Sequence, residues 1–274
     1  MASKKPQLSI IILTWNTAKI TKNCIRSINQ HLKNKLDYEI ILVDNGSTDN
    51  TTTLLKNEDN LSIIKNKQNY GFSKGNNIGA KKAKGDYLLF LNSDIEMTDS
   101  NLVNMLNYYV NKPNIGLIGP KFLNPDLSVQ GSVFPPQTPL NALKEYWFNQ
   151  KEAYSKYYPK SLSPQKVWSI SGGAILINKN IFNKVDGWDE RYFFYYEDLE
   201  LCRQIRKLYL DIIYYPKMKV IHRHGASGSN LAGNENQWRR LIPSSKIYHG
   251  LVKHNLLFLI IWTGQRWQKL LSKN

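Results

Sequence analysis

Largely apolar stretches alternate with amphipathic ones through the first half of the chain. The apolar stretches are short and rich in β-branched residues, which is typical of parallel strands buried on both faces. They cover residues 8–14, 38–44, 61–65, 86–92 and 114–120. Between them, apolar side chains recur at helical spacing in residues 18–31, 72–84 and 100–110. The alternation predicts an α/β domain with a mostly parallel, twisted, Rossmann-like sheet that has helices on both faces.

Polar residues follow three of these predicted strands at the point where each strand ends. They form the segments Thr14-Trp15-Asn16, Asp44-Asn45-Gly46-Ser47 and Asn92-Ser93-Asp94. Because right-handed crossovers place the carboxyl ends of parallel strands along one edge, we expect these segments to lie close together. A single acid after a strand is usually a helix cap or a turn residue. Three polar strand ends at one edge favour a ligand site.

The regular alternation stops at residue 121. Residues 121–166 contain several prolines and a stretch rich in tyrosine and lysine, and we expect a long excursion with irregular or short helical structure. Loops of this length in a compact domain are usually functional or mobile. Residues 167–178 are predicted to return to the sheet as one strand or a strand pair, with two adjacent glycines that allow close backbone approach.

A second polar group lies beyond residue 178. A helix is predicted after Tyr195, because apolar residues recur at helical spacing there, and Glu197 and Asp198 fall in its first turn. The segments DIIYYP and MKVIHRHGAS are predicted to be two short strands. The second of them ends in His222 and His224, which are two residues apart.

The C-terminal residues 236–274 are predicted to form one or two helices. Seven consecutive apolar residues, LLFLIIW, are flanked by basic residues and tryptophans. That pattern is typical of a helix in the headgroup region of a membrane. The alternative is a helix packed on the α/β domain or on a second subunit, with a solvated basic face. No stretch approaches the ~20 apolar residues that a transmembrane helix needs.

Composition narrows the class of partner. Lysine and arginine exceed aspartate and glutamate, 37 against 21, so the formal net charge is +16. This excess favours anionic partners, namely nucleic acid, acidic membrane or phosphorylated small molecules, although compositional drift accounts for it equally well. Cys24 and Cys202 lie in predicted helices without a CxxC partner, which fits a reducing cytoplasm and argues against a zinc site or a disulfide framework. The N-terminal apolar run is predicted to be a strand and not a signal peptide.

Five segments of the chain resemble the family 2 glycosyltransferases, and in particular their rhamnosyltransferase-like branch. The segments are SIIILTWN, EIILVDNGSTDNT, NYGFSKGNNIGAKKAKGDYLLFLNSD, SGGAILINKNIFNKVDGWDERYFFYYEDLELCRQI and VIHRHGASG. They occur in the family's order and span roughly residues 8–228. The resemblance implies a GT-A fold, with a nucleotide-sugar-binding catalytic domain over residues 1–230 and a C-terminal helical extension over residues 231–274.

The resemblance also implies a divalent metal, Mn²⁺ or Mg²⁺, and a nucleotide-diphosphate sugar. Asn92-Ser93-Asp94 resembles the family's DxD motif with asparagine in place of the first acid, so Asp94 is the expected metal ligand. In relatives a histidine completes the metal site; His222 aligns best with it and His224 is the alternative. Such a cation binds hard oxygen ligands and stabilises the charge that builds on the leaving diphosphate. The residues implied for nucleotide binding are Thr14, Asn16, Asp44, Asn76, Asn92 and Ser93.

Two of the implied roles have alternatives in the residues themselves. Asp44 resembles the family residue that contacts the nucleobase, but the turn that follows it needs an Asp or Asn in any case. Glu197 and Asp198 resemble the family's ED motif, which makes Asp198 the expected general base and Glu197 a residue that orients or binds the acceptor. Both acids would also complement the dipole of the helix that they begin.

The acceptor is expected to bind beside these acids. Trp188, Asp189 and Glu190 precede a run of five aromatic residues, and together they are expected to offer a surface on which a sugar stacks.

The resulting hypothesis is an inverting, metal-dependent glycosyltransferase. It would move a sugar from a UDP- or dTDP-sugar, with dTDP-rhamnose as the family-level expectation, to a hydroxyl of a glycan or lipid-linked acceptor in cell-surface polysaccharide synthesis. The expected location is the cytoplasm, with the anionic inner face of the cell membrane as a further partner. Nucleic acid is not expected, because carboxylates lie on the binding edge.

Two alternatives and several open points accompany this hypothesis. A sugar nucleotidyltransferase has a similar sheet, but TWNTAKITKN lacks the Gly-rich basic signature of those enzymes. A catalytically inactive GT-A-like basic protein that binds membrane or nucleotide is the other alternative. The sugar, the acceptor, the choice between the two metals and the oligomeric state are left open.

Overall fold

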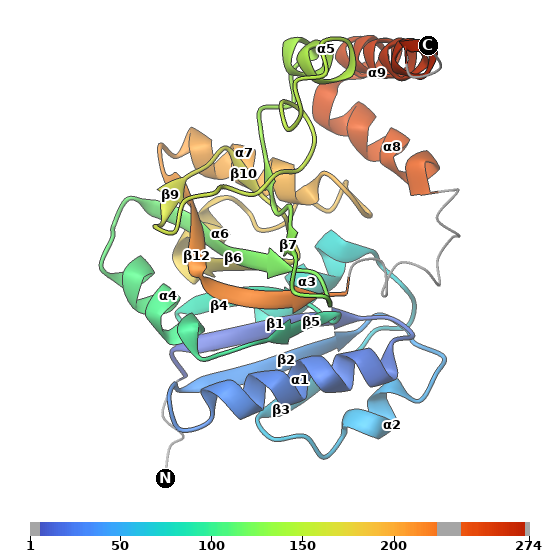
Figure 1. Cartoon of the computed structure of the whole chain (residues 1–274). Coiled ribbons are helices and arrows are strands. Elements are labelled where there is room, and N and C mark those ends of the chain that lie inside the picture. Colours follow the sequence, from blue (N-terminus) through green and yellow to red (C-terminus); the bar gives the residue numbers. More distant parts are fainter. Residues whose placement is uncertain (1–5, 224–236, 272–274) are drawn as a thin grey trace.

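The computed structural model describes residues 6–223 and 237–271 of the chain, and a ten-stranded mixed sheet forms its centre (Figure 1). The strands of that sheet are β1 (Leu8–Thr14), β2 (Tyr38–Asp44), β3 (Leu61–Lys65), β4 (Tyr87–Asn92), β5 (Ile95–Met97), β6 (Ile115–Leu123), β7 (Val129–Gln130), β9 (Gln165–Lys166), β11 (Ala174–Asn178) and β12 (Asp211–His222). A separate two-stranded sheet pairs β8 (Val133–Phe134) with β10 (Ser169–Ile170). The helices are α1 (Ala18–Leu32), α2 (Thr51–Leu55), α3 (Phe72–Lys82), α4 (Asn101–Val110), α5 (Pro139–Tyr146), α6 (Lys179–Lys184), α7 (Glu197–Lys207), α8 (Gln237–His249) and α9 (Leu251–Leu271).

The N-terminal half of the sheet is parallel, as predicted. The main path of strands runs β3-β2-β1-β4-β11-β6-β12-β5. Strands β1 to β4 pair in parallel with one another, and β12 pairs in parallel with β6. Strand β11 runs antiparallel between β4 and β6, which makes the sheet mixed. The α/β prediction is therefore confirmed, and the predicted bounds of β1, β2 and β3 match the structure residue for residue.

Two apolar cores form because successive side chains of a strand point to opposite faces. On β1, Ile10 and Ile12 belong to the core under α1 and α4, whereas Ile11 belongs to the core under α3, α6 and α7. Helix α3 lies unusually close to β1, because a Cβ on Gly75 would stand 2.4 Å from a methyl carbon of Leu13. This close contact brings the beginning of α3 to the carboxyl ends of the strands.

The predicted pair of strands after α7 is one strand in the structure. β12 runs through the whole of residues 211–222, with a shift in its register against β6 between Tyr215 and Lys219. Pro216 lies within that shifted stretch, and proline has no N–H group to donate to a neighbouring strand. The break predicted between two strands is therefore an irregularity inside a single strand.

The C-terminal helices pack on the excursion that interrupts the alternation. Helix α9 lies against α5, which belongs to that excursion, and the rings of Trp147 and Trp267 stack with their centroids 6.1 Å apart. Gln268 Nε2 donates to the carbonyl oxygen of Tyr146 at 3.0 Å. The predicted C-terminal helical region is confirmed, whereas the predicted boundary at residue 230 lies outside the described residues. No helix in residues 6–223 or 237–271 combines the length and the apolar character that crossing a bilayer requires.

Candidate active site

The three polar strand ends meet at one edge of the sheet. The register pairs Thr14 of β1 with Asp44 of β2, and Leu13 of β1 with Asn92 of β4. A small pocket of about 70 Å³ lies at this edge. Its lining residues are Leu13, Thr14, Trp15, Asn45, Asn69, Gly71, Phe72, Asn92, Ser93, Phe193 and Phe194. Of the residues expected to bind nucleotide, Thr14, Asn92 and Ser93 line this pocket, and Asn16, Asp44 and Asn76 do not.

Hydroxyl groups cluster where β1 turns into α1. Thr14 Oγ1 lies 2.9 Å from Thr17 Oγ1 and 2.8 Å from Thr21 Oγ1, and these side chains are buried. Ser93 Oγ approaches the same group, 3.4 Å from Thr17 Oγ1. The hydroxyls hold the ends of β1 and β4 together at the floor of the pocket.

The other three expected nucleotide residues hold loops or helix turns. Asn16 Oδ1 accepts from the Thr48 N–H at 2.8 Å and so joins the loops after β1 and β2. Asp44 Oδ1 accepts from the Ser47 N–H at 2.9 Å, which is the turn role that the sequence offered as the alternative. Asn76 Nδ2 donates to the carbonyl oxygen of Phe72, one turn back in α3, at 3.0 Å.

Sequence reasoning did not single out Asn45, although it organises the pocket. Its Nδ2 donates to Asn69 Oδ1 at 2.8 Å and to the Gly71 carbonyl at 3.2 Å. Its Oδ1 accepts from the N–H of Tyr70 at 3.1 Å. The amide thereby holds the loop before α3 against the end of β2. The only signal in the sequence was its place in the polar segment after β2.

Asp94 and His222 lie together although 128 positions separate them in the chain. The antiparallel pairing of β12 with β5 sets His222 opposite Ile95, and Asp94 Oδ1 stands 3.5 Å from His222 Nε2. Both residues are buried. On the other side of the ring, Nδ1 lies 2.6 Å from Gln130 Oε1. Because an amide oxygen only accepts, Nδ1 donates to Gln130 in this arrangement, and Nε2 is the ring nitrogen on the side of Asp94, through which a neutral histidine can bind a metal.

This pair has the chemistry of a divalent-cation site, although it is not a complete one. A carboxylate oxygen and an imidazole nitrogen are ligands that Mn²⁺ accepts. In the described part of the chain, no three His, Cys, Asp or Glu side chains gather as a metal-binding group. Among the described residues, Asp94 and His222 are therefore the two candidate ligands here. His224, the alternative ligand, lies outside the described residues. Gln130, which orients His222, comes from the irregular excursion and was not expected from the sequence.

Glu197 and Asp198 begin α7, directly after a sharp turn of the backbone. Tyr195 and Tyr196 both have positive φ, 72° and 66°, which non-glycine residues rarely adopt. The turn buries both acids. Asp198 Oδ2 accepts from the Gly172 N–H at 2.9 Å, and Oδ1 accepts from the Leu199 N–H at 2.8 Å. Helix periodicity predicted this position, but the bond to Gly172 depends on the fold.

The electrostatic environment separates the roles of the two acids. Burial, and then the charge of Asp198, raise the pKa of Glu197 well above its usual range. Burial also raises the pKa of Asp198, but Lys156 and the N–H groups of Gly172 and Leu199 act in the opposite direction. Asp198 is therefore the first acid of the pair to ionise, and its carboxylate is the form that can accept a proton. Carboxyl pairs with separated pKa values commonly divide the acid and base roles between them.

Lys156 is the residue near these acids that the sequence did not reveal. It lies in the irregular excursion, and its ammonium group donates to Ser171 Oγ at 3.2 Å and stands over the Phe134 ring. Although part of its side chain is exposed, its charge lowers the pKa of both Asp198 and Glu197.

The residues expected to bind the acceptor line a cleft that Glu197 and Asp198 do not line. Trp188 is only 1% exposed, and its ring packs edge-on against Phe72 and Phe90 with centroids 5.3 and 5.2 Å away. The expectation of a sugar-stacking surface at Trp188 therefore needs correction, because this ring fills the core under α3. The residues around Trp188 in the sequence give no signal that distinguishes a ring on the surface from a ring in the core.

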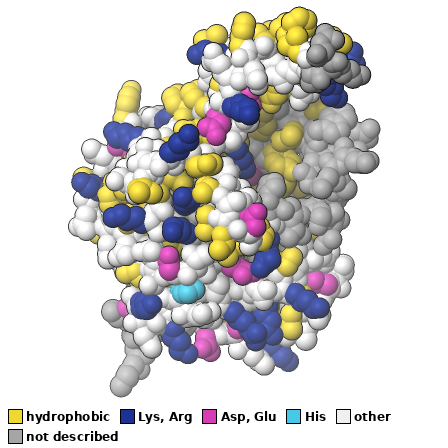
Figure 2. Space-filling view, in the orientation of Figure 1, with side chains coloured by type: hydrophobic (Ala, Val, Ile, Leu, Met, Phe, Trp, Pro, Cys, Tyr) yellow, Lys and Arg dark blue, Asp and Glu magenta, His cyan; other side chains and the backbone are white. Residues whose placement is uncertain are grey.

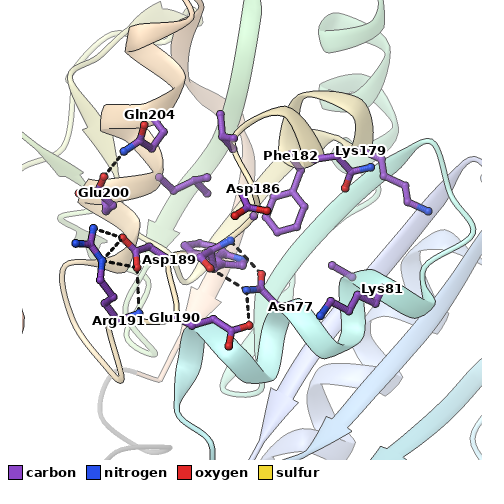
Figure 3. Close-up of a pocket in the computed structure, with 16 residues that line it drawn as sticks. Asn77, Lys81, Lys179, Phe182, Asp186, Asp189, Glu190, Arg191, Glu200 and Gln204 are labelled. Atoms are coloured by element: carbon purple, nitrogen blue, oxygen red, sulfur yellow. Dashed lines mark hydrogen bonds and ion pairs between the residues drawn. The ribbon is translucent and has the colours of Figure 1, made fainter.

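Asp189 and Glu190 line a separate cleft of about 800 Å³ between α3, α6 and α7 (Figure 3). Asp189 pairs with Arg191, and Glu190 Oε1 accepts from Asn77 Nδ2 at 3.1 Å. The described residues that line this cleft do not include Glu197 or Asp198. Asp189 and Glu190 are thus held by Arg191 and Asn77, in a cleft that Glu197 and Asp198 do not line.

A link of two glycines joins the strand ends to Asp198. The Asn92 N–H donates to the Gly173 carbonyl at 2.8 Å, and the neighbouring Gly172 binds Asp198. A Cβ on Gly172 would lie 3.3 Å from the Cβ of Asp198, so this position has little room for a side chain. The polar edge and the acid pair therefore lie next to each other.

The profile of the family named Glycosyl transferase family 2 matches residues 9–186, which is more than half of the chain. The chain belongs to glycosyl transferase family 2.

Curated relatives agree with this family. The chain is 24% identical over 242 residues to the N-acetylglucosaminyl-diphospho-decaprenol L-rhamnosyltransferase of Mycobacterium tuberculosis, covering 80% of this chain and 77% of that protein. It is 25% identical over 225 residues to the O-antigen biosynthesis protein RfbC of Myxococcus xanthus, covering 81% of this chain. The chain spans only 18% of the length of that second relative. The name of the first of these relatives agrees with the expected rhamnosyltransferase-like branch.

Solved structures agree with the fold. GalNAc-T7 with UDP, GalNAc and Mn²⁺ superposes with a TM-score of 0.63 at 16% identity, over 81% of this chain and 44% of that one. The mannosyltransferase PcManGT of Pyrobaculum calidifontis, in complex with GDP-Man and Mn²⁺, superposes with a TM-score of 0.60 at 16% identity, over 92% and 64% of the two chains. This family 2 glycosyltransferase therefore has the GT-A fold.

Replacing Lys156 by methionine is expected to move the pH dependence of this glycosyltransferase. The ammonium charge lowers the pKa of Asp198, so its loss raises that pKa, and a larger share of Asp198 is protonated at any acidic pH. If Asp198 is the base, the acidic limb of the kcat profile then moves to higher pH, and the rate recovers on the alkaline side. Measuring kcat across the pH range tests this prediction.

The exposed Lys160 offers a matched control for this substitution. Lys160→Met removes the same charge from the same excursion and should leave the profile unchanged. A profile that is the same for Lys156→Met and the wild-type chain would contradict the role of Lys156.

Proposed function

We propose that this chain is an inverting, metal-dependent glycosyltransferase that moves a sugar from a UDP- or dTDP-sugar to a hydroxyl of a glycan or lipid-linked acceptor. dTDP-rhamnose is the first donor to test, and cell-surface polysaccharide synthesis is the proposed role. The observation that carries the proposal is the Gly172-Gly173 link, which joins Asp198 to the polar strand ends where Asp94 lies.

Asp198 acts as the base in this proposal. It takes the proton of the acceptor hydroxyl as the acceptor oxygen forms a bond to the anomeric carbon. The bond from that carbon to the diphosphate oxygen breaks, and the nucleoside diphosphate leaves with the electron pair. Burial raises the pKa of Glu197 and so favours its protonated form, in which it can donate a hydrogen bond to the acceptor. Displacement from the opposite side inverts the anomeric carbon.

The strand ends bind the donor in this proposal. Thr14, Asn92 and Ser93 contact the nucleotide from the pocket, while Asn16, Asp44 and Asn76 shape the loops and the helix turn around it. A divalent cation, when bound, stabilises the charge that develops on the diphosphate. Asp94 and His222 would hold it, with the diphosphate oxygens as further ligands. Two solved neighbours are complexes that hold a nucleotide or a nucleotide sugar together with Mn²⁺, which supports this choice.

Thermal unfolding with a panel of UDP, dTDP and GDP, each with Mn²⁺, Mg²⁺ or EDTA, tests the donor class. A ligand at about 100 times its Kd stabilises the folded state by ~2.7 kcal/mol, which gives a readily measured shift in Tm. We expect the shift with UDP or dTDP and only with metal. No shift with any nucleotide would favour the alternative of an inactive GT-A scaffold.

We further propose that the outer face of α9 contacts an anionic membrane surface. This face turns away from α5 and carries exposed apolar side chains, with Val252 86% and Leu251 65% exposed. Its members are Leu251, Val252, Leu256, Phe258, Leu259, Trp262 and Leu270. The residues of α9 include three cations and no acid. Figure 2 shows apolar and basic side chains together at this end of the molecule.

An exposed apolar face flanked by cations fits a bilayer interface better than a second copy of the chain. Two copies of α9 in a symmetric dimer would bring like charges together, whereas anionic lipid headgroups neutralise them. The helix is therefore expected to lie in the plane of the interface.

Sedimentation with lipid vesicles tests this surface. The full chain should sediment with vesicles that contain phosphatidylglycerol and much less with phosphatidylcholine alone. Phe258→Asn with Leu259→Asn should reduce binding several-fold, whereas the matched control Leu127→Asn with Leu162→Asn should not, because those exposed leucines lie elsewhere. Equal binding by both variants, or a dimer in solution that the first variant disrupts, would contradict the proposal.

A further inference from the structure

A second cleft lies between α7, the segment before α5 and the junction of α8 with α9, and its volume is about 530 Å³. Its lining includes four cationic side chains and no carboxylate from the described residues. The cations are Arg203, Arg206, Lys207 and Lys253. The cleft is separate from the strand-end pocket and from the cleft that Asp189 lines, and the proposed sugar transfer gives it no role.

The two arginines of this cationic cleft are held in place by aromatic rings. The Arg206 guanidinium stands 4.1 Å from the centroid of Trp168, and it also donates to the Trp168 carbonyl and to Ser169 Oγ. The Arg203 guanidinium stands 4.4 Å from the centroid of Tyr248 and donates to its carbonyl at 3.0 Å. Guanidinium groups fixed in this way lose little side-chain freedom when they bind an anion.

The described residues balance the positive charge of the cleft only in part. Of its four cations, only Arg203 forms a salt bridge with an acid of the described residues, and that acid is Glu200. Burial, and then the charge of Lys253, lower the pKa of His249 to about 4, so this histidine is neutral at physiological pH. Burial, and then Arg203, also lower the pKa of Lys253. An anionic ligand would relieve this mutual repulsion of the cations.

The cleft has the size and chemistry of a phosphate site. A volume of roughly 300–1,000 Å³ is usual for a small-molecule site. Guanidinium and ammonium groups bind phosphate oxygens through charge-assisted hydrogen bonds, and guanidinium does so with two parallel N–H groups. No metal is required for such binding, in contrast to the strand-end pocket.

The position of the cleft points to the source of the phosphate. Arg206 follows Asp198 by eight residues on α7, about 12 Å along the helix axis at 1.5 Å per residue. Lys253 lies in the first turn of α9, whose outer face is proposed to contact lipid. A phosphate held here would lie between the lipid surface and the candidate base.

We propose that the cationic cleft binds the phosphate or diphosphate group of a lipid-linked acceptor. This inference rests on the proposed function, because it names the acceptor class of that reaction. The lipid chain extends toward α9, and the sugar attached to the phosphate presents its hydroxyl to Asp198. Arg206 and Lys253 hold the phosphate, and Arg203 keeps its pairing with Glu200.

Binding of farnesyl diphosphate to the full chain in EDTA tests the cleft without catalysis and without the metal of the donor site. Replacing Arg206 and Lys253 together by glutamine should weaken this binding about tenfold or more, because two charge-assisted contacts are lost. The matched control replaces Lys56 and Lys112 by glutamine, two exposed lysines near α2 and α4, far from the cleft, and it should change binding less than about twofold. A Tm equal to that of the wild-type chain shows that each variant remains folded.

Three results would overturn the inference. No farnesyl diphosphate binding by the wild-type chain excludes the site, and equal weakening in both double variants shows a general effect of charge. Inorganic diphosphate binding as tightly as farnesyl diphosphate shows a site for free phosphate, with no preference for the lipid-linked form. UDP binding with Mn²⁺ is measured alongside in both variants. Its absence from the wild-type chain would count against the donor proposal alone, since the cleft is tested without metal.

Discussion

Replacing Asp198 by asparagine is expected to lower the rate of sugar transfer by about 10²–10⁴-fold, the usual contribution of a general base. Asparagine keeps the shape of the side chain, and its amide oxygen can still accept from the Gly172 N–H, so the turn into α7 should survive. Its amide has no basic electron pair to take the proton of the acceptor hydroxyl. Donor affinity should stay within about twofold, because Asp198 does not line the strand-end pocket.

Two measurements on the same samples separate chemistry from folding. Transfer is followed by product formation, and donor binding by the thermal shift with nucleotide and metal. Asp126→Asn is the matched control, because Asp126 lies in an exposed turn and accepts bonds from Ser128 that asparagine can also accept. Turnover of Asp198→Asn close to that of the control would exclude Asp198 as the base.

Replacing Asp94 by asparagine is expected to abolish the metal-dependent stabilisation by nucleotide diphosphate. Asp94 supplies the carboxylate of the Asp94–His222 pair, and a neutral amide is a much weaker ligand for a hard divalent cation. With the nucleotide at about 100 times its wild-type Kd, the loss corresponds to ~2.7 kcal/mol of ligand-linked stability. Thermal unfolding with UDP or dTDP, with and without Mn²⁺, measures it.

Glu96 offers a control two residues away. It lies on β5, accepts from Arg223 at 2.9 Å and is part of a partly exposed salt bridge. Glu96→Gln removes one negative charge close to the site and should keep the metal-dependent shift. The same shift in Asp94→Asn and the wild-type chain would show that the cation binds elsewhere or is not needed.

The parallel strands and their polar ends could be predicted from the sequence, because both depend on short-range patterns. β1 and β2 are apolar on both faces, and an uninterrupted apolar run of that length is stable only between two helical layers. The helix that begins at Glu197 was predicted by the spacing of Leu199, Cys202 and Ile205, all of which are buried. The family resemblance then named Asp94 and Asp198, and the GT-A fold that it implied is confirmed by the solved structures.

Contacts between distant segments could not be predicted in this way. Lys156 and Gln130 come from an excursion without periodicity, so nothing local in the sequence shows that one approaches Asp198 and the other His222. Trp188 has the same aromatic neighbours in the chain whether its ring faces solvent or the core, and only the folded chain places that ring against Phe72 of α3 and Phe90 of β4.

The cationic cleft is another feature that the sequence alone did not predict. Arg206 and Lys253 are ordinary charges in the sequence, on two helices that the structure brings to one cleft. The sequence by itself determined the main strands and helices of the regular N-terminal half, their order, the acids at their ends and the helix that begins at Glu197, because hydrophobic periodicity and turn chemistry act within a few residues. Only the tertiary structure decided which side chains share a cavity, because burial is settled by the packing of the whole chain.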